Sequence, residues 1–255
     1  MNRSTGWVGG SWLLAAVVTL VALGGCRESD PESELDRFVD RTGNLDAEVL
    51  VDTLWTAINE GPPNSVFASF LMGNHYYRAA GDSAGRAGWQ DQGVGALLDS
   101  AEVHFDRAAT QDTTFIEAVV NLGSVWDDRA EMTSGRDERI AAQNTAEQYY
   151  LRALDLDPSD QKARCNLGGL YLRQRRTEDA LGAFQAALEH DPESSLAHYN
   201  LAIMFAEAKI YREALREWEL AVKYDPDGDI GDRSRDNVRI VTELMNAPAA
   251  GPPTR

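Results

Sequence analysis

The strongest constraint on the fold is a period of 34 residues in the second half of the chain. The segments LDLDPSD, LEHDPES and VKYDPDG place Pro158, Pro192 and Pro226 at two equal spacings of 34. Self-similarity at a period of this size indicates an array of small structural units that stack on one another. Five more pairs of similar residues have the same separation: Leu167 and Leu201, Tyr171 and Phe205, Ala180 and Ala214, Phe184 and Trp218, and Ala187 and Ala221.

Each unit has the pattern of two amphipathic helices, because its apolar residues recur at intervals of three and four. The Asp before each proline is disfavoured in the helical conformation, so the second helix is predicted to end there. Asp160 and Ser194 stand two residues after their prolines. We predict that they cap the first helix of the following unit.

The same pattern occurs upstream with longer spacings. The first upstream copy lies 45 residues before the unit that contains Leu167, and the next lies 50 residues further upstream. We predict that the additional residues form loops between the paired helices, in or near 80–95 and 129–139. The residues that carry the upstream pattern are Leu122, Gly123, Trp126, Ala146, Tyr150, Ala153 and, before them, Met72, Gly73, Tyr76, Ala101, Phe105 and Ala108.

This pattern resembles the tetratricopeptide repeat, which has a small pair and an aromatic in its first helix and then Ala, aromatic, Ala and Pro. The resemblance implies an all-α fold, an α-solenoid of stacked antiparallel helix pairs. It covers 66–228, as the units 66–115, 116–160, 161–194 and 195–228. Around it we predict a linker and helix pair in 26–64, a capping helix in 229–246 and a disordered tail in 247–255. One departure is that Arg175 and Lys209 stand at the turn where the family has Gly.

In such a repeat the motif residues act through packing. Gly168 and Ala180 are small, so the two helices of one unit can approach closely. Tyr171 and Phe184 then fill the space between adjacent units. Because no unit buries its apolar face alone, we expect stacking to supply most of the stability.

The N-terminus has the layout of a secretion signal, predicted for 1–25. An apolar stretch from Trp12 to Leu23 follows a start that carries Arg3, and Gly24, Gly25 and Cys26 come next. The segment 23–26 resembles the bacterial lipobox, which implies that Cys26 receives a lipid and becomes the mature N-terminus. An uncleaved membrane anchor is the alternative, since 7–25 holds no charged side chain. In bacterial relatives Asp after the lipidated Cys retains the protein in the inner membrane, so Arg27 favours the periplasmic face of the outer membrane.

Charge and cysteine content restrict the partners and the redox chemistry. The chain has 24 Lys and Arg against 41 Asp and Glu, a net charge of −17. Such an acidic surface repels phosphate backbones, so we expect no nucleic-acid partner. Cys165 is the only other cysteine. It is predicted to be a buried, inert thiol.

The string GDSAG at 81–85 matches the G-x-S-x-G spacing of a hydrolase nucleophile. A nucleophile elbow requires a strand before the serine, whereas this string follows a helical pattern. We therefore predict a flexible loop and no enzyme activity.

The segment DPDGDIGD at 225–232 alternates Asp residues and could chelate calcium. Its sixth position is Ile230, where a full calcium loop needs Gly. We favour a solvated turn and expect no metal and no cofactor.

The predicted binding surface is the concave groove that the first helices line in the tetratricopeptide-repeat family. Asn121, Asn166 and Asn200 occupy one position in three successive units. In the family an Asn there binds a ligand backbone, and an amide can both donate and accept; the alternative is that it ties one helix to the next. An apolar trough is predicted beside the asparagines, with Arg173 and Glu207 further along. The trough comprises Val120, Ser124, Cys165, Gly169, Tyr199 and Ile203.

These features predict a lipid-anchored envelope scaffold or assembly factor that binds an apolar or helical segment of another envelope protein. Lysines that would clamp an acidic tail are absent, because Val120, Cys165 and Tyr199 stand in their places. The alternative is an accessory or regulatory subunit with a ligand or metal site in the insertions or in the Asp-rich turn.

Overall fold

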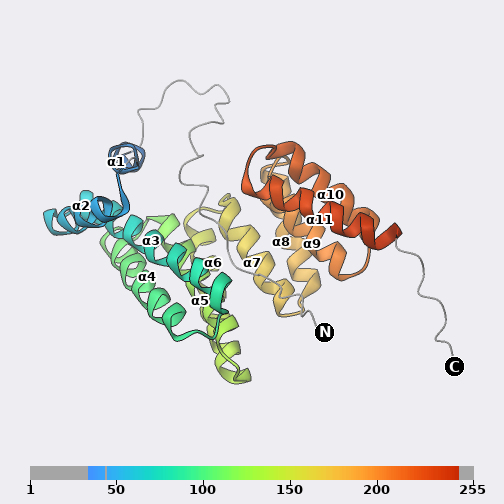
Figure 1. The fold of residues 1–255 in the computed structure, drawn as a ribbon, viewed down its shortest axis with the longest axis horizontal. Coiled ribbons are helices and arrows are strands. Elements are labelled where there is room, and N and C mark those ends of the chain that lie inside the picture. Colours follow the sequence, from blue (N-terminus) through green and yellow to red (C-terminus); the bar gives the residue numbers. More distant parts are fainter. Residues whose placement is uncertain (1–33, 44, 247–255) are drawn as a thin grey trace. The chain divides into compact units, whose positions relative to one another are not determined.

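The computed structural model describes residues 34–43 and 45–246, and this part of the chain is all-helical (Figure 1). The predicted signal segment, the lipobox with Cys26 and the C-terminal tail 247–255 lie outside the described residues. The helices are α1 (Glu34–Thr42), α2 (Ala47–Glu60), α3 (Asn64–Ala87), α4 (Gln92–Gln111), α5 (Ile116–Met132), α6 (Arg136–Leu156), α7 (Gln161–Arg173), α8 (Thr177–His190), α9 (Ser195–Glu207), α10 (Tyr211–Tyr224) and α11 (Asp229–Asn246).

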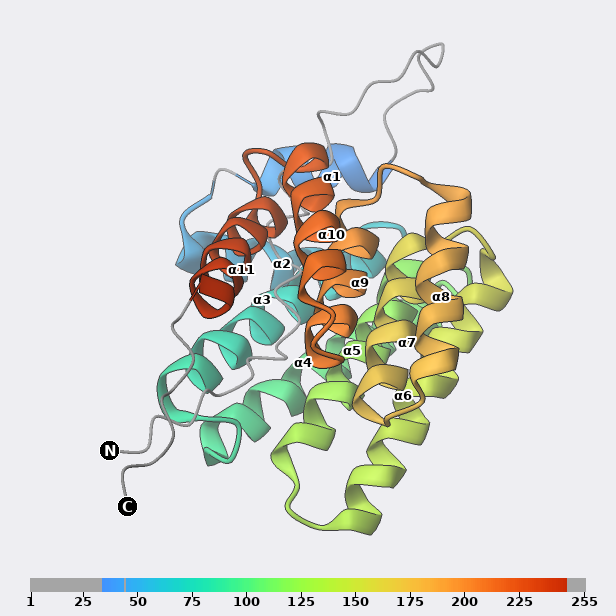
Figure 2. The same cartoon turned by 90° about the vertical axis from the view of Figure 1, so that its right-hand side faces the viewer.

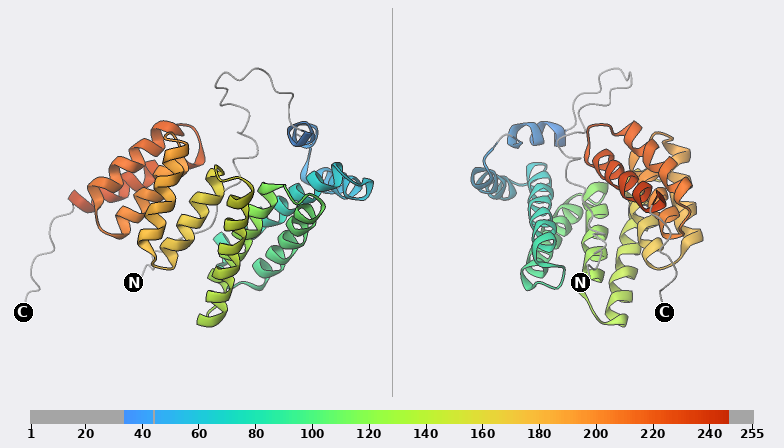
Figure 3. Two further views of the ribbon diagram at one scale, coloured as in Figure 1. Left: turned by 180° about the vertical axis from the view of Figure 1, so that it is seen from behind. Right: turned by 45° about the vertical axis from the view of Figure 1, so that its right-hand side comes forward.

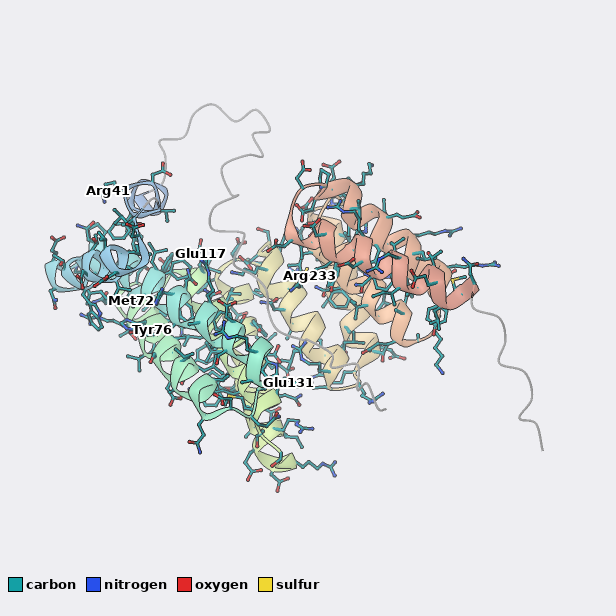
Figure 4. The ribbon with its side chains drawn as sticks, viewed as in Figure 1. Arg41, Met72, Tyr76, Glu117, Glu131 and Arg233 are labelled. Carbon is teal, nitrogen blue, oxygen red and sulfur yellow. The ribbon has the colours of Figure 1, made fainter. Side chains whose placement is uncertain are left out.

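The helices form two compact units, one that ends at Pro158 and one that begins at Ser159. In the first unit, α3 pairs with α4 and α5 with α6, and α2 packs on α3 (Figure 3). The contact between α2 and α3 is apolar: Leu54, Ala57 and Ile58 pack with Ala68 and Met72. Figure 4 marks Met72 one turn before Tyr76, which packs against the same cluster.

The second unit holds two helix pairs and a final single helix. α7 pairs with α8 and α9 with α10, while α11 packs on α10 and α9 (Figure 2). Tyr171 and Phe184 of one repeat pack with Leu201 and Met204 of the next, as predicted. The predicted fold of stacked antiparallel helix pairs with a C-terminal capping helix is confirmed.

Within each pair, a small residue lets an aromatic ring of the partner helix lie against the backbone. A Cβ atom built on Gly168 would be 2.4 Å from Cε1 of Phe184, and one on Gly123 would be 2.5 Å from Cε1 of Tyr150. Gly73 stands in the same relation to Phe105, at 2.5 Å from Cδ1. These distances are shorter than van der Waals contact, so a larger residue would force the helices apart.

We expect Gly168→Leu to lower the free energy of unfolding by about 1–3 kcal/mol, because the added side chain overpacks the contact with Phe184. Denaturant unfolding of the variant and the wild type measures this difference. Gly182→Leu is the control, since nothing lies within 4 Å of a Cβ atom at Gly182. An equal effect of both substitutions would contradict the packing role of Gly168.

The helix ends follow the predicted caps. Asp160 accepts a hydrogen bond from the N–H of Ala163 at 2.6 Å, and the Ser194 hydroxyl accepts one from Ala197 at 3.3 Å. Both side chains satisfy N–H groups that the first turn of a helix leaves without a partner.

In the second unit, α7 and α9, the first helix of each pair, are followed by left-handed residues that are not glycine. Arg175 has φ 62° and Lys209 has φ 61°. At the second site the N–H of Lys209 donates to the carbonyl of Ala206 and that of Ile210 to Phe205, at 2.9 and 2.8 Å. This is the Schellman motif, in which the left-handed position usually holds Gly. The turn of the family is therefore kept although its glycine is not.

We expect Lys209→Gly to raise the free energy of unfolding by about 1 kcal/mol, because Gly has no Cβ to strain the left-handed backbone. Thermal unfolding monitored by circular dichroism detects the gain. Arg212→Gly, one turn later at an exposed helical position, should be destabilising. A loss of stability in both variants would contradict this explanation of the turn.

The prediction of loops at 80–95 and 129–139 is wrong for most of these residues. Gly81 to Gly85 lie inside α3, which continues to Ala87, and α5 continues to Met132. The longer hairpin has apolar contacts of its own, since Ala80, Ala84 and Val94 are buried. This burial outweighs the cost of about 1 kcal/mol for each glycine in a helix. The insertions thus lengthen helices, and Ser83 lies on a continuous helix with no strand before it.

Among the described helices, none combines the length and the apolar character needed to cross a bilayer.

Candidate protein-binding site

The predicted binding residues of the second unit that lie on α9 are partly exposed. Tyr199, Asn200 and Ile203 are each half-buried. The side chain of Asn200 makes no hydrogen bond to another residue that the structure describes. Asn166 has the equivalent position on α7 and is also half-buried.

The capping helix lies against part of this surface. Tyr199 and Ile203 pack around a buried cluster that includes Trp218 and Val241, and Val238 of α11 packs against the same cluster. The inner side of α9 is therefore an apolar surface bounded by α11. The repeat pattern alone did not indicate this boundary.

The predicted trough is shorter than the sequence suggested. Cys165 is buried against Ala187 and Ala197, and Val120 and Ser124 are buried as well. Burial raises the pKa of the Cys165 thiol to about 12, so this cysteine is the inert core residue that the sequence predicts. The trough prediction is wrong for these three residues, whereas Gly169, Tyr199 and Ile203 keep part of their surface.

Arg173 lies at the exposed end of α7 and acts on the charge at the end of α9. Partial desolvation raises the pKa of the Glu207 carboxyl, and the positive charges of Arg175 and Arg173 oppose this shift. Opposite charges, from Arg173 and Arg175 at and just after the end of α7 and from Glu207 on α9, therefore lie together at the ends of α7 and α9.

Asn121 has a different environment from Asn200 although it holds the same repeat position. It is buried on α5, and its Nδ2 donates to Oδ1 of Asn74 on α3 at 2.9 Å. This bond ties one helix to another, the alternative that the sequence left open. A ligand-binding role for Asn121 stays a prediction.

Sequence reasoning missed a polar network on α5. The Tyr77 hydroxyl donates to Oδ2 of Asp128 at 2.6 Å, and Asp127 beside it is also buried. The hydroxyl of Tyr150 donates to Oγ of Ser124 at 3.3 Å. The sequence feature that could have indicated this network is the pair Asp127 and Asp128, directly after the aromatic Trp126 of the motif.

Comparison with known proteins agrees with this geometry. The tetratricopeptide-repeat family matches residues 144–187 and 165–229. Residues 144–229 therefore match tetratricopeptide repeats. No curated protein sequence matches the chain.

Solved structures, among them one of a tetratricopeptide-repeat (TPR) protein, resemble this chain over most of its length. TTC0263, a thermophilic TPR protein of Thermus thermophilus, has a TM-score of 0.65 at 13% identity over 82% of this chain and 98% of that one. Human IFIT1, solved as a dimer with PPP-AAAA, has a TM-score of 0.56 at 13% identity over 77% and 50%. At these identities the likeness establishes the TPR fold alone.

In the last TPR repeat a histidine joins three segments. Nδ1 of His198 lies 2.7 Å from Oε2 of Glu217, and Nε2 lies 3.1 Å from the carbonyl oxygen of Pro192. A carbonyl and a carboxylate accept hydrogen bonds, so both contacts are satisfied together only when both ring nitrogens carry a proton. The ring also stacks on Tyr224, with centroids 5.5 Å apart.

The protonated ring is favoured by these contacts. Burial would lower the pKa of His198, but the hydrogen bonds to Glu217 and Pro192 and the charges of Glu217 and Asp191 raise it above its ordinary value. A raised pKa in the folded state means that the folded protein holds this proton more tightly than the unfolded chain does.

The Asp-rich turn after the repeats has a structural role. Oδ2 of Asp225 accepts hydrogen bonds from the N–H groups of Ile230 and Gly231, at 3.0 and 3.1 Å. The carboxylate therefore caps the start of α11. Within residues 34–43 and 45–246, no group of three or more His, Cys, Asp or Glu side chains is placed to hold a metal ion.

We expect the stabilisation from His198 to be complete below its unfolded pKa of about 6.5 and lost as pH rises through its higher folded value. The free energy of unfolding of the wild type should therefore fall relative to that of His198→Gln as the pH rises above about 6.5. Denaturant unfolding at several pH values measures the difference. His190→Gln, an exposed position at the end of α8, is the control, and parallel pH profiles for wild type and His198→Gln would contradict the favoured protonation of the His198 ring.

Proposed function

We propose that this chain is a lipid-anchored scaffold or assembly factor of the bacterial cell envelope, whose TPR array binds another envelope protein. The anchor is supported by the sequence Leu23-Gly24-Gly25-Cys26 after an apolar stretch. Arg27 after the cysteine supports the periplasmic face of the outer membrane. TPR folds are built for protein contacts, because stacked helix pairs form extended surfaces.

The observation that carries the binding proposal is the environment of Asn200. Its amide bonds to none of the described residues, while the neighbouring Tyr199 and Ile203 add half-buried apolar surface on the same helix. An amide can donate to and accept from one peptide unit, which fixes the register of a bound segment. Tyrosine supplies a large contact area at a small cost in conformational entropy.

The chemistry of this surface favours an apolar or helical segment as the partner. Tyr199 and Ile203 offer no positive charge, so the surface has no clamp for a terminal carboxylate. The net charge of −17 repels acidic segments as well. Arg173 and Glu207, at the ends of the two first helices, provide one charge of each sign for polar contacts at the rim.

A photo-crosslinking amino acid at Ile203 in living cells is expected to capture one envelope protein, and one at Tyr199 is expected to capture the same protein. Mass spectrometry identifies the captured chain. Glu219, exposed on α10, is the matched control position and should not give this adduct. Asn200→Ala should reduce the adduct from Ile203 several-fold, because one register-fixing contact is lost.

The same cells test the anchor. Cys26→Ser should move the protein from the membrane fraction to the soluble fraction and abolish labelling by an alkyne fatty acid. Equal adducts from Ile203 and Glu219, or adducts that Asn200→Ala leaves unchanged, would refute the binding surface. Membrane retention of Cys26→Ser without lipid labelling would instead support the uncleaved membrane anchor.

A further inference from the structure

The capping helix α11 has apolar residues on its exposed side as well as on the side that packs against α9 and α10. Ser234 and Val241 are buried and Val238 is half-buried against α9 and α10. Beside this face lie Ile240 and Leu244, which are 53% and 54% exposed. They are four residues apart and so share one side of the helix.

The exposed apolar surface extends to the end of the repeat array. Met245 is 45% exposed and follows Leu244 in the last turn of α11. A short turn joins α10 to α11 and the two helices pack together, so they run antiparallel. This topology places the turn between α9 and α10, where Ile210 is 44% exposed, at the same end of the array. Several large aliphatic side chains exposed together are unusual for a surface with no partner.

A line of acidic residues lies beside Ile240 and Leu244 on α11. Asp229, Asp236 and Glu243 recur every seven residues and are exposed, so they lie along one side of α11. Asp236 is four residues before Ile240 and Glu243 is three residues after it, which makes them its neighbours on the helix surface. Arg239 binds Asp236 at 3.1 Å, and Arg233, seven residues before Ile240, lies on the same side of the helix nearer its start (Figure 4).

We propose that Ile240 and Leu244, with Met245 beside them in the last turn of α11, form a docking stripe for an amphipathic helix of a partner protein, whose apolar face is edged by Lys or Arg. An exposed helical stripe fits the apolar face of a second helix, with anchors at intervals of three and four. Basic side chains along the edge of the partner helix would meet the acidic line of Asp229, Asp236 and Glu243.

Charge decides against a second copy of this chain as the occupant. Two antiparallel α11 helices would bring the acidic line of one copy beside that of the other. Each copy also carries a net charge of −17, so association works against long-range repulsion. The acidic line and the net negative charge both attract a basic helix, and its binding should weaken as salt screens the charges.

The test uses the full chain and a fluorescent synthetic helix of about 18 residues, with Leu on one face and Lys along its edges. Fluorescence anisotropy is expected to show binding that weakens with salt. A peptide with the same Leu face and Glu along its edges should bind at least about tenfold more weakly.

Substitutions in α11 locate the site. Leu244→Asp is expected to weaken binding of the Lys peptide by about tenfold or more, since it removes a central apolar anchor. Thr242→Asp adds the same charge at an exposed position on another side of the helix, and it should have little effect. Circular dichroism of both variants verifies that the fold is retained.

A second pair of variants tests the acidic line. Asp236→Asn with Glu243→Gln should weaken binding several-fold and flatten its salt dependence. Glu189→Gln with Glu219→Gln changes the net charge equally on α8 and α10 and should not do so. Asn200→Ala should leave peptide binding unchanged, which separates this stripe from the proposed surface on α9.

Three results would overturn the proposal. Equal binding of the Lys and Glu peptides would remove the role of the acidic line, and unchanged binding by Leu244→Asp would remove the stripe. Light scattering that shows a dimer of the wild type, but a monomer of Leu244→Asp, would assign the stripe to a second copy.

Discussion

The close approach of two helices within each pair is the contact on which the rest of this structure depends. In α3–α4, α5–α6 and α7–α8 an aromatic ring lies directly on a glycine backbone, as with Phe184 on Gly168 and Tyr150 on Gly123, and in α9–α10 the small Ala202 stands at the equivalent position. The contact fixes the distance between the helices and so sets the position of every other side chain on them. Each pair still exposes one apolar face, which is why Tyr171 and Phe184 need Leu201 and Met204 of the next repeat.

The repeat pattern predicted this architecture well because its signals are local. Apolar spacing of three and four, the Asp-Pro ends and the caps at Asp160 and Ser194 act within a few residues, so their outcome does not require knowledge of distant parts of the chain. The insertions were predicted less well. Glycine in GDSAG favours a loop on propensity alone, but buried neighbours such as Ala80, Ala84 and Val94 continue the helix through it.

The candidate site shows the same division. Asn121 and Asn200 are equivalent in sequence, yet Asn121 is buried and bonded to Asn74 while Asn200 is half-buried and bonds to no other described residue. Position in the repeat predicts which way the side chain points, but only the adjacent helix decides whether the amide is already bonded. The sequence predicts Cys165 both as a core thiol and as part of the trough, and its burial against Ala187 and Ala197 leaves only the first role.

The sequence by itself determined the all-α repeat fold, the pairing of helices, their caps and the acidic character of the surface. These follow from periodicity, from short-range backbone chemistry and from the charge count, all of which can be read along the chain. The tertiary structure alone decided that the insertions are mostly helical, that the Asp225 carboxylate caps α11, and that both ring nitrogens of His198 face acceptors, on Glu217 and Pro192. It also decided which apolar residues of α11 remain exposed. Each of these outcomes depends on groups that are distant in sequence or brought together by a turn, because burial and hydrogen bonding are properties of the packed chain.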